Sequence, residues 1–242
     1  MVKVRGKIIE IFSSIQGEGL WVGRPQVFVR FKGCRLKCNF CDTPLTHSKI
    51  NEARIEFPPF SKNFEKRPLE FSVEELNQTI RRFEIPSLAL TGGEPLEQVD
   101  FLEEWLKTLE ASTEILLETD GIEVEALKKV IDRIDMVSLD IKIPSATKES
   151  SFWERHDEFI QTAIKRPAYA KVVFDEQMTI EEIDRLGGFI QKYPALPFIF
   201  QPVSPLQKRD MSKIFSIFQK FSTLAPTQVR LIPQVHKFFS IL

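Results

Sequence analysis

The three cysteines of this 242-residue chain, Cys34, Cys38 and Cys41, lie within eight consecutive positions. Thiolates at this spacing on one loop can bind a single metal centre, and Gly33 permits the tight turn that this requires. A structural zinc ion is one candidate, with His47 as a fourth ligand. An iron–sulfur cluster of the cubane form normally takes four cysteines, so three cysteines would leave one iron open to another ligand. Buried thiols without a metal are the third alternative.

The balance of basic and acidic residues limits the kinds of molecule that this protein is expected to bind. The sequence has 33 basic and 34 acidic residues and a net charge of -1, so no broad basic surface for nucleic acid is expected. No run approaches the roughly 18 apolar residues of a membrane span, and the apolar start is too short for a signal peptide. We therefore expect a cytoplasmic protein with a small-molecule partner. In that reducing compartment the cysteines are ligands or catalysts rather than disulfide partners.

Apolar segments rich in β-branched residues alternate with amphipathic segments along the chain. Strands are predicted at 7–12, 26–33, 87–93, 114–119, 136–142, 169–174, 196–202 and 229–233. Helices are predicted at 98–110, 123–134, 152–165 and 208–222, and capping boxes at Ser72 with Glu75 and at Thr179 with Glu182 start two more. The alternation indicates an α/β fold with a mostly parallel sheet, in one domain over residues 1–242. About six βα units are too few for an eight-stranded barrel, and the pattern leaves a partial barrel or a doubly wound sheet open.

The segment 46–70 interrupts this alternation. It contains Pro58, Pro59 and Pro68 among mixed charges and aromatic residues. We expect a long surface loop or insertion here, which is either functional or a local elaboration of the fold.

Polar residues follow several of the predicted strands. TGGEP, residues 91–95, ends one strand, and ETDG, residues 118–121, ends the next. Ser138, Asp140 and Lys142 share one face of the strand 136–142 because side chains alternate along a strand. Such a charged group needs an internal ion pair or a ligand to compensate its burial. Since ligands bind at the carboxyl ends of parallel strands, this placement favours a cofactor contact.

The cysteine spacing, with Phe40 directly before Cys41, resembles the signature of the radical S-adenosylmethionine enzymes. The resemblance implies that the three cysteines hold a 4Fe–4S cluster and that S-adenosylmethionine chelates the fourth iron. An external electron donor of the flavodoxin or ferredoxin type then reduces the cofactor, and a 5′-deoxyadenosyl radical removes hydrogen from a substrate. The implied fold is a partial (β/α)6 barrel of the TIM type, which agrees with the count of βα units.

The same resemblance implies a set of residues that contact S-adenosylmethionine. These are Phe40, Cys41, Asp42, Gly92, Gly93, Glu94, Glu118, Ser138, Asp140, Lys142 and Gln201.

Further segments narrow the resemblance to one family. IQGEG, VRFKGC with the cysteine triplet and CDT, TGGEP, ETDG, DIKIPS, LPFIFQPV and PQVHK together resemble the 7-carboxy-7-deazaguanine synthase family over nearly the whole chain. The reaction implied is the ring contraction of 6-carboxy-5,6,7,8-tetrahydropterin to 7-carboxy-7-deazaguanine with loss of ammonia, in queuosine biosynthesis. A homodimer is implied as well.

This family resemblance also implies a substrate site and a magnesium ion. The substrate contacts are Ile15, Gln16, Gly17, Arg30, Thr91, Gln234 and His236, and the Mg²⁺ ligand is the hydroxyl of Thr43. A guanidinium can bind the substrate carboxylate through two hydrogen bonds, and Mg²⁺ tolerates a single protein oxygen ligand of this kind. Phe40 stands where a tryptophan is more usual, and the tail FFSIL also departs from the family pattern, which leaves a role of the terminal carboxylate open.

Two other functions fit part of the pattern. An activase of a glycyl-radical enzyme shares the cysteine spacing and the small barrel but acts on a protein, and it would lack the IQGEG and PQVHK segments. A structural zinc protein would hold zinc at the cysteines and would not react with S-adenosylmethionine.

Overall fold

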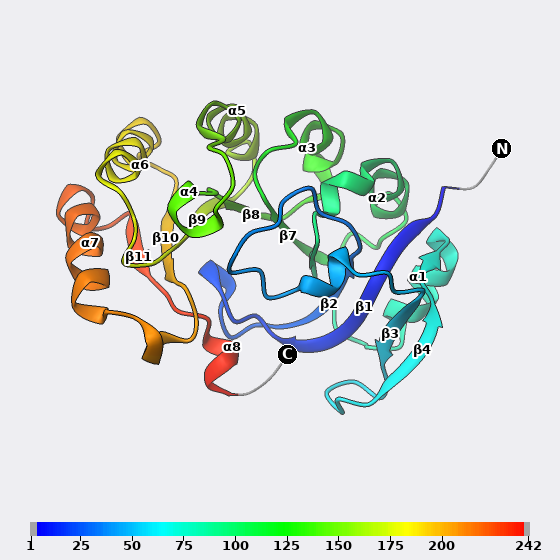
Figure 1. Ribbon diagram of the computed structural model, residues 1–242. Coiled ribbons are helices and arrows are strands. Elements are labelled where there is room, and N and C mark those ends of the chain that lie inside the picture. The colour runs from blue at the N-terminus through cyan, green and yellow to red at the C-terminus, as the bar shows by residue number, and fades with distance from the viewer. Residues whose placement is uncertain (1–3, 240–242) are drawn as a thin grey trace.

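The computed structural model describes residues 4–239, and the strands of this range form one curved sheet (Figure 1). Its strands are β1 Gly6–Ile15, β2 Pro25–Phe31, β3 Glu52–Glu56, β4 Phe64–Pro68, β5 Glu70–Phe71, β6 Ser87–Gly92, β7 Glu114–Thr119, β8 Met136–Asp140, β9 Ala168–Phe174, β10 Phe198–Pro202 and β11 Val229–Leu231. The helices are α1 Val73–Arg81, α2 Val99–Leu106, α3 Val124–Val130, α4 Pro144–Thr147, α5 Trp153–Ala163, α6 Ile180–Lys192, α7 Met211–Leu224 and α8 Val235–Phe238.

The strand order decides between the two folds that the sequence allows. Along the sheet the order is β11-β10-β9-β8-β7-β6-β2-β1-β3-β4, and the neighbours from β2 to β11 are parallel. From β6 to β11 the order never reverses, whereas a doubly wound sheet reverses at a switch point. The helices α2, α3, α5, α6 and α7 follow one another outside the strands (Figure 1). The fold is therefore a partial (β/α)6 barrel, as predicted.

The two predicted capping boxes form as the sequence indicates. Ser72 accepts a hydrogen bond from the Glu75 amide at the start of α1, and Thr179 accepts one from the Glu182 amide at the start of α6. In both cases the glutamate side chain accepts a hydrogen bond from the backbone amide of the capping residue, so two otherwise unpaired amides at the helix start are satisfied. These caps fix where the two helices begin relative to the sheet.

The expected loop or insertion at 46–70 is an insertion, and much of it forms strands rather than an irregular loop. β3 and β4 form an antiparallel hairpin, and β3 also pairs in parallel with β1. Ala53 and Ile55 alternate inward and are fully buried, a pattern that the neighbouring charges and prolines conceal in the sequence. Glu56, which is 1% exposed, accepts hydrogen bonds from the Ser13 amide and hydroxyl and from the Lys62 amide. The hairpin is thus anchored to β1 by a buried carboxylate.

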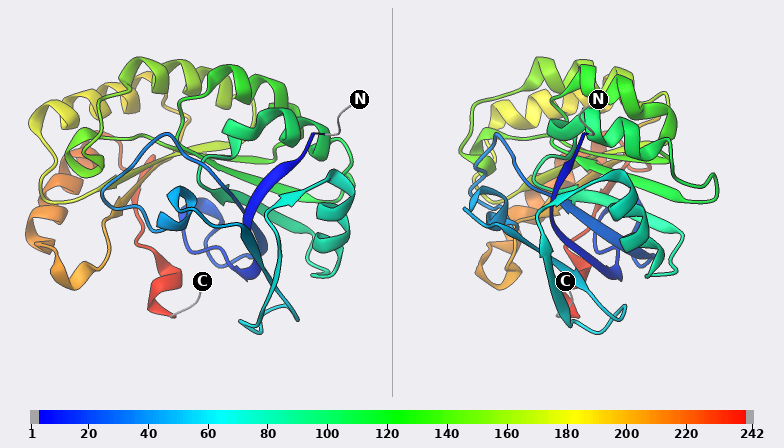
Figure 2. Two further views of the ribbon diagram at one scale, coloured as in Figure 1. Left: turned by 45° about the vertical axis from the view of Figure 1, so that its right-hand side comes forward. Right: turned by 90° about the vertical axis from the view of Figure 1, so that its right-hand side faces the viewer.

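The hairpin and α8 extend from the side of the molecule away from α3, α5 and α6 (Figure 2). Among residues 4–239, no helix combines the length and the apolar composition that crossing a membrane requires.

Candidate active site

One pocket lies at the carboxyl ends of the parallel strands and gathers most of the predicted site residues. It is lined by Ile15, Gln16, Gly17, Arg30, Cys34, Cys38, Phe40, Cys41, Asp42, Thr43, Thr91, Gly92, Gly93, Glu118, Asp140, Lys142, Gln201, Gln234 and His236. These residues come from almost every part of the chain, and the barrel brings them together because parallel strands end at one edge of a sheet.

The cysteine loop is fastened to the TGGEP turn by backbone contacts. The Glu94 amide donates to the Gly33 carbonyl at 2.7 Å, and the Gly33 amide donates to the Thr46 hydroxyl at 2.9 Å. A Cβ atom at Gly93 would lie 1.7 Å from the Gly33 carbonyl oxygen, so only glycine allows this approach. The loop and the turn therefore form one wall of the pocket.

The three cysteines line this wall together, and burial raises the thiol pKa of two of them. Burial raises the pKa of the Cys34 thiol to about 12, and burial also raises the pKa of Cys38 against the opposing charge of Lys142. Without a metal these cysteines are protonated and poor nucleophiles, whereas a bound metal would deprotonate them. His47, the fourth ligand of the zinc alternative, is exposed and is not among the residues that line the pocket.

Arg30 is held inside the pocket rather than free on the surface. Its Nη1 donates to the Thr43 hydroxyl at 3.0 Å, and its Nε lies 3.2 Å from a Glu10 carboxylate oxygen. Its guanidinium also lies over the Phe12 ring, with 5.1 Å to the ring centroid. The Arg30 guanidinium and the Thr43 hydroxyl therefore lie beside each other in the pocket.

A buried chain of charges crosses the pocket floor. Lys171 Nζ lies 2.5 Å from a Glu18 carboxylate oxygen and 3.2 Å from Asp140, whose other oxygen lies 2.6 Å from Lys142 Nζ. Burial alone would lower the pKa of Lys171, but the carboxylates of Asp140, Glu18 and Glu118 raise it well above its ordinary value. The strand-end charges thus form the internal ion pair that the sequence left open, while Asp140 and Lys142 still line the pocket.

Glu18 and Lys171 are pocket residues that the sequence reasoning missed. A lysine in the middle of the apolar strand segment YAKVVF was the available signal, because a charge at such a position is buried and needs a partner. Asp120 was also missed; burial raises its pKa to about 6, and it lies on the pocket wall.

The segments around Gly17 and Val235, far apart in the sequence, meet on the opposite wall. The Val235 amide donates to the Gly17 carbonyl at 2.8 Å, and Gln234 Nε2 donates to Glu18 at 2.7 Å and to Asp42 at 3.2 Å. A Cβ atom at Gly17 would lie 2.0 Å from the His236 ring, so the glycine is needed for this contact. The IQGEG and PQVHK segments therefore form a single surface.

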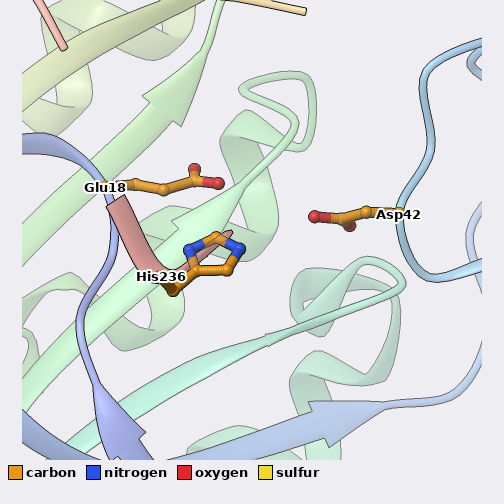
Figure 3. A group of neighbouring side chains, drawn as sticks. All are labelled: Glu18, Asp42 and His236. Carbon is orange, nitrogen blue, oxygen red and sulfur yellow. The ribbon is translucent and has the colours of Figure 1, made fainter. Parts of the chain in front are cut away.

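Three side chains from separate segments face a common space on that surface. Figure 3 shows the carboxylates of Glu18 and Asp42 and the ring of His236 pointing toward one another. One ligand atom of each lies within 4.8 Å of the others. The group is acidic, and Gln16, hydrogen-bonded to Glu118 at 3.1 Å, adds an amide beside it. This wall can hold hydrogen-bond donors of a heterocycle or a divalent cation.

Comparison with known proteins assigns the family. Residues 28–175 match the radical SAM superfamily. The 7-carboxy-7-deazaguanine synthase of Geobacter sulfurreducens is 34% identical over 253 residues and covers 100% of both chains. The chain belongs to the 7-carboxy-7-deazaguanine synthase family. The enzymes of that name from Methanothermobacter thermautotrophicus and Thermococcus kodakarensis are 32% and 33% identical, over 98% and 96% of this chain and 98% of each relative.

A solved structure agrees with the fold. The crystal structure of QueE from Escherichia coli superposes with a TM-score of 0.61 at 20% identity, over 96% of this chain and 95% of that one. The family and fold that the sequence resemblance indicates are thus confirmed, and the glycyl-radical activase and zinc alternatives lose their support.

Membership of the radical SAM superfamily implies a 4Fe–4S cluster and S-adenosylmethionine, and the donor set fits both. Three cysteines line one pocket, which leaves one iron of a cubane cluster for the cofactor. Beside them, Gly92 and Gly93 line the pocket, and the Lys142 ammonium lies over the Phe40 ring, with 5.6 Å to the centroid.

Two predicted cofactor contacts lie off the pocket wall. The Glu94 carboxylate accepts hydrogen bonds from the Leu96 amide, the Thr119 hydroxyl and the Asp120 amide, and burial raises its pKa well above the ordinary value. It joins the TGGEP turn to the end of β7. Ser138 is 1% exposed and is likewise not among the lining residues. The end of the tail, residues 240–242, lies outside the described residues.

Proposed function

We propose that this chain, as one domain over residues 1–242, converts 6-carboxy-5,6,7,8-tetrahydropterin to 7-carboxy-7-deazaguanine with loss of ammonia, in queuosine and 7-deazapurine biosynthesis. The observation that carries the proposal is the convergence of IQGEG, Arg30 and PQVHK on the pocket that contains the three cysteines. The names of the full-length relatives support the same reaction.

The cysteine half of the pocket takes the cofactors. Cys34, Cys38 and Cys41 would hold the cluster, and the TGG turn, Asp140 and Lys142 would bind S-adenosylmethionine. When bound, these cofactors supply a 5′-deoxyadenosyl radical that removes hydrogen from the substrate. The apolar side chains of Phe28, Leu36 and Val173 also line the pocket and would limit the access of water. The electron comes from an external donor of the flavodoxin or ferredoxin type.

The opposite half takes the pterin. Arg30 binds the substrate carboxylate, since its guanidinium already points into the pocket beside Thr43. The acidic group of Glu18, Asp42 and His236 accepts hydrogen bonds from the edge of the heterocycle. The Thr43 hydroxyl would bind Mg²⁺, because its oxygen keeps a lone pair beyond the hydrogen bond that it accepts from Arg30.

The family resemblance and the composition also suggest the oligomeric state, the location and the partners. We expect a cytoplasmic homodimer that binds neither nucleic acid nor membrane. The near-balance of 33 basic and 34 acidic residues supports the absence of a nucleic-acid partner.

Anaerobic purification and reconstitution with iron and sulfide test the proposal. We expect a brown protein with a broad visible absorbance that converts the pterin to 7-carboxy-7-deazaguanine in the presence of dithionite, S-adenosylmethionine and Mg²⁺. Cys38→Ala is the matched control, because it removes one ligand from the same loop. A colourless, zinc-loaded protein would contradict the cofactor assignment, and an intact cluster without product would contradict the substrate.

A further inference from the structure

His156 lies outside the pocket wall and links the segments that follow strands β7 and β8. It lies on α5, is 0% exposed and is not one of the lining residues. Its Nδ1 lies 3.0 Å from the Gly121 carbonyl oxygen, and its Nε2 accepts a hydrogen bond from the Lys142 amide at 3.0 Å. A carbonyl can only accept and an amide can only donate, so the imidazole must be neutral with its proton on Nδ1.

The imidazole stands where the sheet no longer connects the two strands. The last paired residues of β7 and β8 are Thr119 and Leu139, so Gly121 and Lys142 both lie beyond the ladder. A Cβ atom at Gly121, whose φ is +73°, would lie 3.0 Å from the Asp140 carbonyl oxygen and 3.1 Å from His156 Nδ1. The ring therefore continues the link between the strands through two hydrogen bonds and close packing.

The segments that it links carry cofactor-side residues. Lys142 forms the 2.6 Å ion pair with Asp140 and lies over Phe40, and Asp120 precedes Gly121 on the pocket wall. The direction of the Lys142 side chain depends on the backbone amide that His156 holds. Burial lowers the pKa of His156 to about 4, so the ring keeps this arrangement at neutral pH.

We propose that His156 is a positioning residue for S-adenosylmethionine binding, which acts by holding the backbone of Lys142 and Gly121 beyond the end of the sheet. The proposal rests on the proposed function, because it assigns the Lys142 side of the pocket to the cofactor. It predicts that His156 governs cofactor affinity while the pterin half of the pocket is unaffected.

The test compares His156→Leu with His156→Gln in the reconstituted enzyme. Leucine removes both hydrogen bonds, and we expect the Kd for S-adenosylmethionine, measured by equilibrium dialysis, to rise about tenfold. The amide oxygen of glutamine can take the place of Nε2 and accept from Lys142, so its Kd should stay within about threefold of wild type. The iron content and the Kd for the pterin should change by less than about twofold in both variants.

Phe159→Leu is the control for a general loss of stability, because Phe159 is fully buried on the same helix and touches neither strand end through a hydrogen bond. A His156→Leu variant that binds S-adenosylmethionine like wild type would overturn the proposal. Equal losses in His156→Leu, His156→Gln and Phe159→Leu would also overturn it, since the role would then be structural. Wild-type protein that carries the cluster but has no affinity for S-adenosylmethionine would instead contradict the proposed function.

Discussion

Lys171 is the residue on which the charge balance of the pocket depends. Its side chain is 9% exposed, and its ammonium contacts both Glu18 and Asp140, with the Glu118 carboxylate nearby. Buried carboxylates without a cation are costly, so removal of this lysine leaves like charges facing one another.

Lys171→Met should therefore lower the free energy of unfolding by about 3 to 5 kcal/mol, the usual cost of breaking a buried ion pair. Chemical denaturation monitored by circular dichroism measures the change. Lys192→Met is the control, because Lys192 pairs with Asp157 at the surface and is 52% exposed; its effect should stay below about 1 kcal/mol. A loss in Lys171→Met as small as that expected for Lys192→Met would show that the Lys171 network is not stabilising.

Arg30 is the residue that we assign to the substrate carboxylate. Arg30→Ala should raise the KM for the pterin at least about tenfold, since a charge-assisted hydrogen bond is lost, and leave substrate-independent formation of 5′-deoxyadenosine unchanged. Steady-state kinetics with product detection by mass spectrometry measures both. Arg54→Ala is a matched control: Arg54 contacts the other oxygen of Glu10 but is 47% exposed and outside the pocket lining. Loss of both activities in Arg30→Ala would make Arg30 structural.

At the scale of elements, α5 joins the outer helix layer to the site through one buried histidine. The folded-state pKa of His156 is about 4, below its ordinary value of 6.5. Between these values the unfolded chain binds more protons than the folded one, so the stabilisation is complete above pH 6.5 and is lost as the pH falls toward 4.

We expect this single group to remove about 3 kcal/mol of stability across that window. The free energy of unfolding of wild type and His156→Gln, measured at several pH values from 4 to 7, checks the sign and the size. The wild-type curve should fall more steeply on the acid side than that of the glutamine variant, which has no group to protonate there. Equal pH dependence of the unfolding free energy in wild type and His156→Gln would contradict the lowered pKa of His156.

The hairpin β3–β4 is an element at the edge of the sheet. β4 ends the strand order, and Phe60 at the hairpin turn is 57% exposed. An open strand edge beside an exposed aromatic side chain is typical of a surface that pairs with another chain.

At the scale of the whole molecule, this surface supports the expected homodimer. We predict that sedimentation equilibrium gives about twice the monomer mass and that Phe60→Ser shifts the equilibrium toward monomer. Phe215→Ser is the control, because Phe215 is 55% exposed on α7, away from the hairpin. A monomeric wild-type protein would contradict the dimer, and equal shifts in both variants would place the interface elsewhere.

The sequence by itself determined the repeating βα architecture, the capping boxes and the family, because these depend on local spacing and on motifs of adjacent residues. The spacing of Cys34, Cys38 and Cys41 left zinc, an iron–sulfur cluster and free thiols open, and the resemblance carried by the other motifs favoured the cluster with an open iron. The strands within the insertion at 46–70 are not predictable from the sequence, because the alternation of Ala53 and Ile55 is too short to stand out among charges.

Only the tertiary structure decided which charges meet. Lys171 is 153 residues from Glu18 along the chain, and Gln234 is 216 residues from it, yet both contact its carboxylate. Likewise, His156 is separated by 35 residues from the Gly121 carbonyl that it contacts. Such pairings arise from strand order and curvature of the sheet, which bring distant segments to one edge, and no local pattern encodes them.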